Sequence, residues 1–376
     1  MSINPIEWIN DEKPSTIFSE IPQIKTDNSS IMPLKYFDNI YSDKQSKTFK
    51  ILSIDGGGSR ILYSLYVLNE FEKKYCKNGL LLRNYFDMLC GTSIAGSICI
   101  LISKGFSIEK IINIFEDNII KIFPNGAFYQ IYHFIMQLFG SKYNDHILKS
   151  ILQKYVEDEI FNTTTLHNYI CVPSFNLATN NICVFTNYHN TNQFKTKDII
   201  LSTCAAPTYF PSHKISSEYY IDGAIWSNNP SMVGLYEASE HFIDNDKFNK
   251  CSILSIGNIV STEQICPSSS YFWNIFKIPT LINVILDSVE CSINHYMKNI
   301  SKFTNNIYVR ISHKELYSSP IDASSINVLS HLKKHGIDDG LNIIDEQNNN
   351  TTHFNITQFF VNHTAQQFDN CSISKY

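Results

Sequence analysis

Hydrophobic runs that end in turns of small residues mark the best-defined part of the chain. Residues 49–54 (FKILSI) predict a buried strand, which ends in the turn DGGGSR at 55–60. Apolar positions then recur mostly three apart over 61–71, and this spacing predicts a helix. A second strand at 85–90 meets another small-residue turn and a helix that continues to residue 102. Strand, turn and helix in alternation predict an α/β fold with a mostly parallel central sheet.

The same criteria extend the pattern toward the C-terminus. Further strands are predicted at residues 169–175, 182–186, 219–221, 252–256 and 306–311. Mainly helical segments are predicted at residues 107–160, 275–300 and 325–345. We therefore expect a polar N-terminal leader over 1–47, one α/β domain over 48–345, and an Asn-rich tail over 346–376.

Composition excludes several classes of protein. Hydrophobic residues make up 43% of the 376 residues and charged residues 17%, which is enough apolar material for a large core. The net charge is -5 and no basic stripe is visible, so we expect no nucleic-acid partner. None of the ten cysteines forms a Cys-x-x-Cys pair, which favours reduced thiols and no metal framework.

Targeting signals are not apparent either. The N-terminal segment lacks the apolar stretch of a secretory signal, and no run of 18 apolar residues would span a bilayer. These features lead us to expect a cytoplasmic protein. Peripheral contact with a membrane stays open, because an acidic protein can dock on lipid through apolar groups.

A serine lies where the second strand meets its helix. A sharp strand-to-helix turn with small neighbours exposes a nucleophilic serine, usually in the pattern Gly-x-Ser-x-Gly. The alternative is a serine that only caps the helix N-terminus. The last position of the pattern is alanine here, which adds a methyl group. The candidate nucleophile is Ser93, with Gly91, Thr92, Ile94 and Ala95 as the turn around it.

The glycine loop after the first strand is a candidate anion site. Gly56, Gly57 and Gly58 allow backbone N–H groups to point toward a ligand at a helix N-terminus. Such donors can hold the oxyanion of an ester's tetrahedral intermediate. A nucleotide cradle is the competing interpretation, but the loop lacks the Walker pattern and the full Gly-x-Gly-x-x-Gly spacing. The third interpretation of the loop is a tight turn that binds no ligand. Arg60 is expected either to pair with a carboxylate or to reach a lipid phosphate.

A carboxylate at a strand end completes the set. Asp222 precedes Gly223 and Ala224, so it is placed to act as a general base if its environment raises its pKa. A turn aspartate is the alternative. A Ser-His-Asp triad would need a late histidine, and none has a recognisable triad context; the available residues are His213, His295, His313, His331 and His335.

Together these segments resemble the patatin-like phospholipase family over residues 48–345. The resemblance rests on DGGGSR at 55–60, GTSIA at 91–95 and DGA at 222–224, in that order, with STCAAPTYFP at 202–211 and NNP at 228–230 as supporting stretches.

The resemblance implies a modified α/β-hydrolase fold, a three-layer sandwich. It implies that Ser93 attacks the acyl carbonyl and that Asp222 acts as its base. It also implies that Gly57 and Gly58, next to Gly56, form an oxyanion hole that Arg60 closes, with no metal or cofactor. The sequence departs from the family at Ala95 and at Asn258, which replaces a threonine.

The function expected from this resemblance is that of a lipid acyl hydrolase, of phospholipase A type, acting on membrane phospholipids or other acyl lipids. Family members cleave phospholipids, galactolipids or neutral lipids, and the sequence does not choose a head group, an acyl position or a protein activator. The alternative is a catalytically silent relative that binds lipid or a partner protein. A nucleotide-binding α/β protein that uses Gly56–Gly58 is a third hypothesis.

Overall fold

The computed structural model describes residues 48–126, 129, 140–156, 158–189, 194–243, 248–262, 278–316, 319–348 and 355–360. The predicted leader, and the predicted tail apart from 346–348 and 355–360, lie outside these residues.

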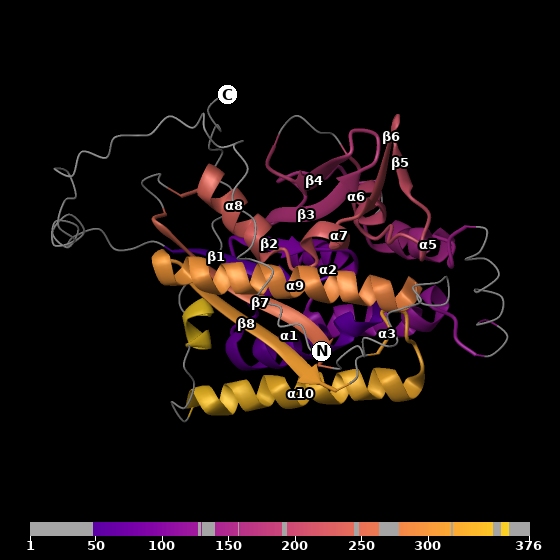
Figure 1. The fold of residues 1–376 in the computed structure, drawn as a ribbon. Helices are drawn as coiled ribbons and strands as arrows, with labels where there is room; N and C mark the ends of the chain where they lie inside the picture. Colours follow the sequence, from indigo (N-terminus) through magenta and orange to yellow (C-terminus); the bar gives the residue numbers. More distant parts are fainter. Residues whose placement is uncertain are drawn as a thin grey trace, which may run out of the picture. The chain divides into compact units, whose positions relative to one another are not determined.

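In the described part of the chain, eight strands form one sheet in the order β5-β6-β3-β2-β1-β7-β8, with β4 on the free edge of β3 (Figure 1). The strands are β1 (Thr48–Ile54), β2 (Met88–Gly91), β3 (Tyr169–Asn176), β4 (Asn181–Thr186), β5 (His213–Ile215), β6 (Glu218–Asp222), β7 (Lys250–Ser261) and β8 (Ile307–Glu315). Neighbours from β3 to β8 pair in parallel, whereas the pairs that involve β4, β5 or β6 are antiparallel.

Helices follow most of the strands. They are α1 (Ile61–Tyr75), α2 (Ile94–Ser103), α3 (Ile108–Ile122), α5 (His146–Tyr155), α6 (Thr196–Thr203), α7 (Ala224–Ser227), α8 (Ser231–His241), α9 (Ile278–Phe303) and α10 (Ile326–Asn348). Short 3-10 turns lie at Gly58–Arg60, Leu82–Asn84 and Ile356–Phe359. Among the described residues, none of these helices combines the length and the apolar character needed to cross a bilayer.

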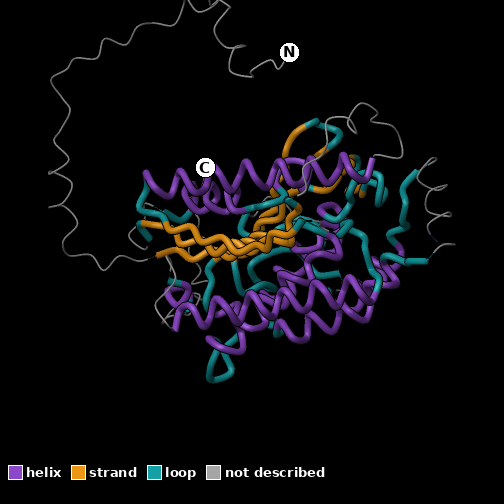
Figure 2. The backbone as a smooth tube through the Cα atoms, turned by 60° about the horizontal axis from the view of Figure 1, so that its bottom comes forward, coloured by secondary structure: helices purple, strands orange, loops and turns teal. Residues whose placement is uncertain are grey.

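Alternation along β1 explains why helices cover both faces of the sheet. Leu52 and Ile54 pack with residues of α1, α2, α3 and α10 in one core. Phe49 and Ile51 point the other way and pack with α8 and part of α9 in a second core. Figure 2 shows the strands between helices on both sides. A strand buried on both faces is typical of parallel sheets, and the predicted three-layer α/β architecture is confirmed.

Two details of the sheet differ from the sequence prediction. β2 begins at Met88 rather than at residue 85, because residues 82–84 form a 3-10 turn and Asp87 uses its carboxylate to accept the N–H of Lys50 at 2.8 Å. The three-residue strand β5 was not predicted, since it is too short to produce an alternating pattern.

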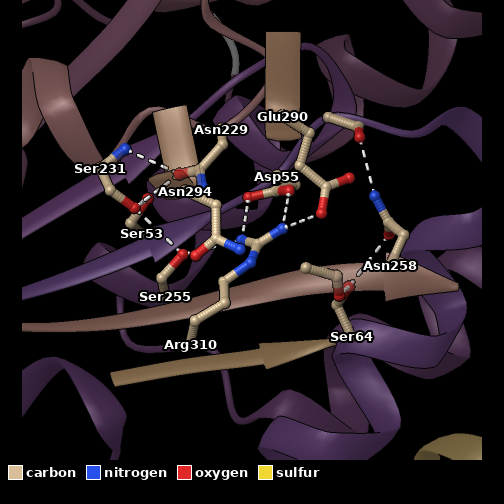
Figure 3. Close-up of polar contacts among 12 residues, drawn as sticks. Ser53, Asp55, Ser64, Asn229, Ser231, Ser255, Asn258, Glu290, Asn294 and Arg310 are labelled. Atoms are coloured by element: carbon tan, nitrogen blue, oxygen red, sulfur yellow. Dashed lines mark hydrogen bonds and ion pairs between the residues drawn. The ribbon is translucent and has the colours of Figure 1, made fainter. Parts of the chain in front are cut away.

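A buried ion cluster fixes the carboxyl end of the sheet (Figure 3). Arg310 on β8 donates to both carboxylate oxygens of Asp55, at 2.7 and 2.5 Å, and to Glu290 of α9 at 2.6 Å. It also donates to Ser255 Oγ on β7 at 2.8 Å. The side chains of Arg310 and Asp55 are only 3% and 0% exposed. The cluster therefore ties the end of β1 to the middle of β7 and β8, directly beneath the glycine loop.

Replacing this arginine tests the role of the cluster. Arg310→Leu leaves the carboxylate of Asp55 buried without its partner, so the free energy of unfolding is expected to fall by about 3–5 kcal/mol. Urea denaturation measures the change. Lys195→Ala, which breaks an exposed pair with Asp158 at 3.3 Å, is the control and should leave the midpoint unchanged. An equally small effect of Arg310→Leu would contradict the assignment.

Candidate active site

Ser93 occupies a strained turn between β2 and α2. Its backbone has φ 58° and ψ -133°, a region that L-residues rarely adopt and that costs roughly 1–3 kcal/mol. A Cβ added at Gly91 would lie 2.4 Å from the carbonyl oxygen of Ala95, so the turn requires glycine there. This is the geometry expected of an exposed nucleophile at the end of a strand.

Hydrogen bonds from distant segments hold the turn. The N–H of Ser93 donates to Thr203 Oγ1 at 2.9 Å, and the Thr203 hydroxyl in turn donates to the carbonyl of Pro173 on β3 at 2.7 Å. The hydroxyl of Thr92 donates to the carbonyl of Ser227 at 2.6 Å. These contacts bind the turn to β3, α6 and α7, so their packing stabilises the strained conformation.

The alanine at position 95 fits without distortion. Its side chain is completely buried, and its N–H donates to the carbonyl of Thr92 at 3.1 Å. The tight approach of helix and strand falls on Gly96 instead, where an added Cβ would lie 3.1 Å from both the Gly91 oxygen and Val172. The departure at Ala95 therefore leaves the turn intact.

Asp222, the last residue of β6, lies beside Ser93. Ser93 and Asp222 line the same cavity, the Ser93 hydroxyl is near enough to lower the pKa of the carboxyl group, and the N–H of Ala224 donates to Oδ1 at 2.8 Å. The antiparallel pairing of β6 with β3 brings the two residues to one edge of the sheet, with Asp222 opposite Ser174. Sequence reasoning singled out both side chains, and the structure brings them together.

Burial sets the acidity of this carboxyl group. Asp222 is 2% exposed, and burial raises its pKa to about 7, against the opposing effect of the nearby Ser93 hydroxyl and of the hydrogen bond from the Ala224 N–H. A carboxylate with a pKa near neutrality can both accept and return a proton at the operating pH.

The glycine loop supplies backbone donors beside the serine. Gly57 and Gly58 line the same cavity as Ser93, and among the described residues their N–H groups have no hydrogen-bond acceptor. The N–H of Gly56 is already used by the carbonyl of Asn228 at 3.0 Å. Gly58 has φ +55°, and a Cβ there would lie 2.0 Å from the oxygen of Ile321. Glycine is therefore required at this position.

Arg60 lies at the end of the glycine loop, with its side chain near carboxylates. Its N–H donates to the carbonyl of Gly57 at 3.1 Å, which closes the loop. Its side chain is 2% exposed and does not line the cavity. Burial lowers the pKa of the guanidinium, and the nearby carboxylates of Asp287 and Glu290 oppose that effect. The arginine thus faces acidic groups of α9.

The cavity above Ser93 is almost wholly apolar. Its walls carry hydrocarbon side chains from several helices, namely Ile94, Phe115, Ile122, Phe123, Leu148, Phe210, Ile282, Ile285, Leu286 and Ile321. A second apolar pocket, between α2, α3 and α5, shares Ile94, Phe115, Ile122 and Leu148 with it. The two spaces adjoin, so a long hydrocarbon chain has a continuous apolar wall to follow.

Three further residues support the site, although none of them was expected to have a role in it. Asn258 donates from Nδ2 to the carbonyl of Gly56 at 2.8 Å and accepts from the Ser64 hydroxyl at 3.1 Å, so it anchors the glycine loop (Figure 3). Asn228 lines the cavity, and within the described residues its buried Oδ1 has no partner. Cys204 lines the same cavity, and burial raises the pKa of its thiol well above the ordinary value.

Histidine does not enter the site. None of the described residues that line the cavity is a histidine, and His213 instead lies 3.0 Å from Asp198 through Nε2. Asp222 is the only acidic residue among the described residues that line the cavity with Ser93.

Comparison with known proteins finds relatives over more than half of the chain. The family model for patatin-like phospholipases matches residues 52–234. A cGAMP-activated phospholipase from Vibrio cholerae is 30% identical over 239 residues, which cover 58% of this chain and 67% of that protein. A protein of the same name from Escherichia coli is 30% identical, over 58% of this chain and 64% of that protein. Patatin-like protein 1 from Arabidopsis thaliana is 24% identical, over 76% of this chain and 80% of that protein.

Among solved structures, VipD from Legionella pneumophila aligns over 80% of this chain and 67% of the VipD chain, at 12% identity and a TM-score of 0.40. The sequence similarities extend over the strand–turn–helix units that hold the glycine loop and Ser93. On this evidence, the chain belongs to the patatin-like phospholipase family of lipid hydrolases.

Proposed function

We propose that this chain cleaves fatty-acyl esters of phospholipids, with Ser93 as nucleophile and Asp222 as general base. The observation that carries the proposal is the position of Ser93 and the buried carboxyl group of Asp222 in the wall of one apolar cavity, with the Ser93 hydroxyl near enough to lower the pKa of that carboxyl group. A serine needs an adjacent base to be a strong nucleophile, and an acyl chain needs a water-free surface to bind.

The chemistry has two steps. Ser93 Oγ attacks the ester carbonyl carbon while its proton passes to Asp222, and the N–H groups of Gly57 and Gly58 stabilise the oxyanion. The tetrahedral intermediate collapses, and Asp222 returns the proton to the departing lysolipid alcohol. Water then gives its proton to Asp222 and attacks the acyl-enzyme, which releases the fatty acid and restores the serine. Neither step uses a metal, so hydrolysis is expected to survive a calcium chelator.

In the proposed complex, the acyl chain and the head group of the lipid occupy different locations. The acyl chain lies against the apolar wall and extends past Ile94 and Leu148 into the second pocket. Each buried methylene contributes roughly 0.8 kcal/mol, so the long chains of membrane lipids are favoured over short esters. The polar head group stays outside, which fits an enzyme that works on a lipid surface.

Covalent labelling tests the nucleophile. A fluorophosphonate is expected to modify Ser93, and Ser93→Ala should lose both the label and at least about 10³-fold in turnover of mixed phospholipids. Mass spectrometry of the labelled peptide and of the lipid products measures both. Ser150→Ala, which changes an exposed serine of α5 that lines neither pocket, is the matched control and should keep label and activity.

Two outcomes would end the proposal: hydrolysis by Ser93→Ala at the wild-type rate, or a wild-type protein that stays unlabelled. The second outcome is that of a silent relative that binds lipid or protein. Assays should be run with and without cGAMP, because two relatives are named as cGAMP-activated phospholipases. An enzyme that needs an activator is then not mistaken for a relative without catalytic activity.

The raised pKa of Asp222 predicts the pH profile. The base must be ionised, so kcat/KM should rise as the pH increases, with an apparent pKa of about 7, and level off above it. Initial rates on a soluble long-chain ester between pH 5 and 9 provide the measurement. A profile that is flat down to pH 5 would exclude this carboxyl group as the base.

The same shift predicts an effect on stability. The ordinary pKa of an aspartate, which applies in the unfolded chain, is 3.8, whereas the pKa of Asp222 in the folded protein is about 7. Between these two pH values the folded protein binds a proton at Asp222 that the unfolded chain has lost, so the stability of the protein falls as the pH rises. Asp222→Asn should therefore be inactive but more stable than the wild type at pH 8, with the difference vanishing near pH 4. Urea denaturation at both pH values tests this, with exposed Asp117→Asn as control. Lower stability of Asp222→Asn at pH 8 would contradict the account.

A further inference from the structure

Five polar side chains gather where β8 meets α10, and none of them lines the cavity. His313 and Glu315 lie two residues apart at the end of β8, so they project from the same face of the strand. His331, His335 and Asp339 lie four residues apart on α10, so they share one face of the helix.

The contacts between the two elements are close. His313 Nδ1 lies 2.9 Å from Asp339 Oδ2, and His331 Nε2 lies 2.9 Å from Glu315 Oε2. The ring of His335 stands between the other two imidazoles, with centroid distances of 4.3 Å to His313 and 4.4 Å to His331. One ligand atom from each of His313, Glu315 and His335 lies within 4.8 Å of the others. Small side-chain movements would bring these atoms around one ion.

Asp339 orients one of the imidazoles. With a proton on Nδ1, His313 donates to the Asp339 carboxylate and keeps the lone pair of Nε2 for coordination. The hydroxyl of Tyr63, a buried residue of α1, donates to the same carboxylate oxygen at 2.8 Å. A ligating histidine held by a carboxylate, which is itself hydrogen-bonded, is the usual outer arrangement of protein metal sites.

The backbone around the cluster is fixed by close packing. A Cβ added at Gly336 would lie 2.6 Å from the carbonyl oxygen of Tyr63, so α10 crosses α1 at short range next to His335. His313, Glu315 and His335 are each half-buried, so solvent reaches the cluster. The site is thus held in place by the fold and open to an ion.

We propose that His313, Glu315 and His335 bind a divalent transition-metal ion of the zinc class. Two imidazoles and a carboxylate suit zinc, whereas calcium and magnesium prefer oxygen ligands alone. His331 lies within reach as a fourth ligand, and Asp339 positions His313. The ion clamps α10 onto β8 and takes no part in ester cleavage.

A second cluster, formed by His189, Glu237 and His241, is the closest rival. Glu237 is buried there and accepts a hydrogen bond from Tyr188 at 2.5 Å, while both histidines are exposed. The carboxylate of Glu237 therefore already accepts a hydrogen bond from within the protein. This cluster supplies a matched control, because His241→Ala removes the same kind of ligand from a different part of the molecule.

Zinc titration of the full chain tests the proposal. Metal-free protein is titrated with Zn²⁺ against a chromophoric chelator. We expect one tight equivalent, at least about 100-fold weaker binding in His313→Ala and His335→Ala, and about 10–100-fold weaker binding in Asp339→Asn. His241→Ala should bind as the wild type does. At free zinc 100 times Kd, the Tm of the wild type should rise by about 4 °C, and that of His335→Ala should not.

Zinc affinity that is unchanged in both His313→Ala and His335→Ala, or that is lost in His241→Ala, would overturn the proposal. The metal-free Tm of each variant shows that it is folded, and His335→Gln replaces His335→Ala if that variant unfolds. Binding and Tm are read without lipid substrate, so the result stands apart from the hydrolytic activity.

Discussion

The backbone of Ser93 is the constraint on which the rest of the site depends. At φ 58° and ψ -133° the residue is strained, and it projects its hydroxyl from the end of β2 toward Asp222. The strain of roughly 1–3 kcal/mol persists because the surroundings leave the chain no alternative. Gly91 makes room for the turn, and Thr203 accepts the Ser93 N–H at 2.9 Å.

The anion-binding side of the site is held in the same way by distant residues. Asn258 on β7 anchors the carbonyl of Gly56, and the carbonyl of Ile321 accepts the N–H of Ser59 at 2.7 Å. Beneath the loop, Arg310 neutralises Asp55 at the end of β1. The glycine loop and Ser93 thus stand at the carboxyl ends of the adjacent parallel strands β1 and β2, where open α/β sheets place their ligands, and Asp222 reaches them from the end of the antiparallel strand β6. A mobile turn would not hold two N–H donors ready for an oxyanion.

Local patterns were enough to predict much of this structure. The strands and helices around residues 49–71 and 91–102 carry strong periodicity, and Ser93 and Asp222 lie in recognisable motifs. The contacts of Asn258 and Arg310 were not predictable, because each joins segments some 200 residues or more apart in sequence. Arg60 was expected either to pair with a carboxylate or to reach a lipid phosphate, and its buried side chain lies near Asp287 and Glu290, acidic residues that no local pattern connects with it.

The central claim is that the hydroxyl of Ser93 reacts while Gly57 and Gly58 hold the developing oxyanion. A crystal structure of the fluorophosphonate adduct examines this most directly. The account predicts phosphorus bonded to Ser93 Oγ and a phosphoryl oxygen about 2.7–3.1 Å from the nitrogen atoms of Gly57 and Gly58. Phosphorus on another residue, or a phosphoryl oxygen that makes no contact with either N–H group, would contradict it.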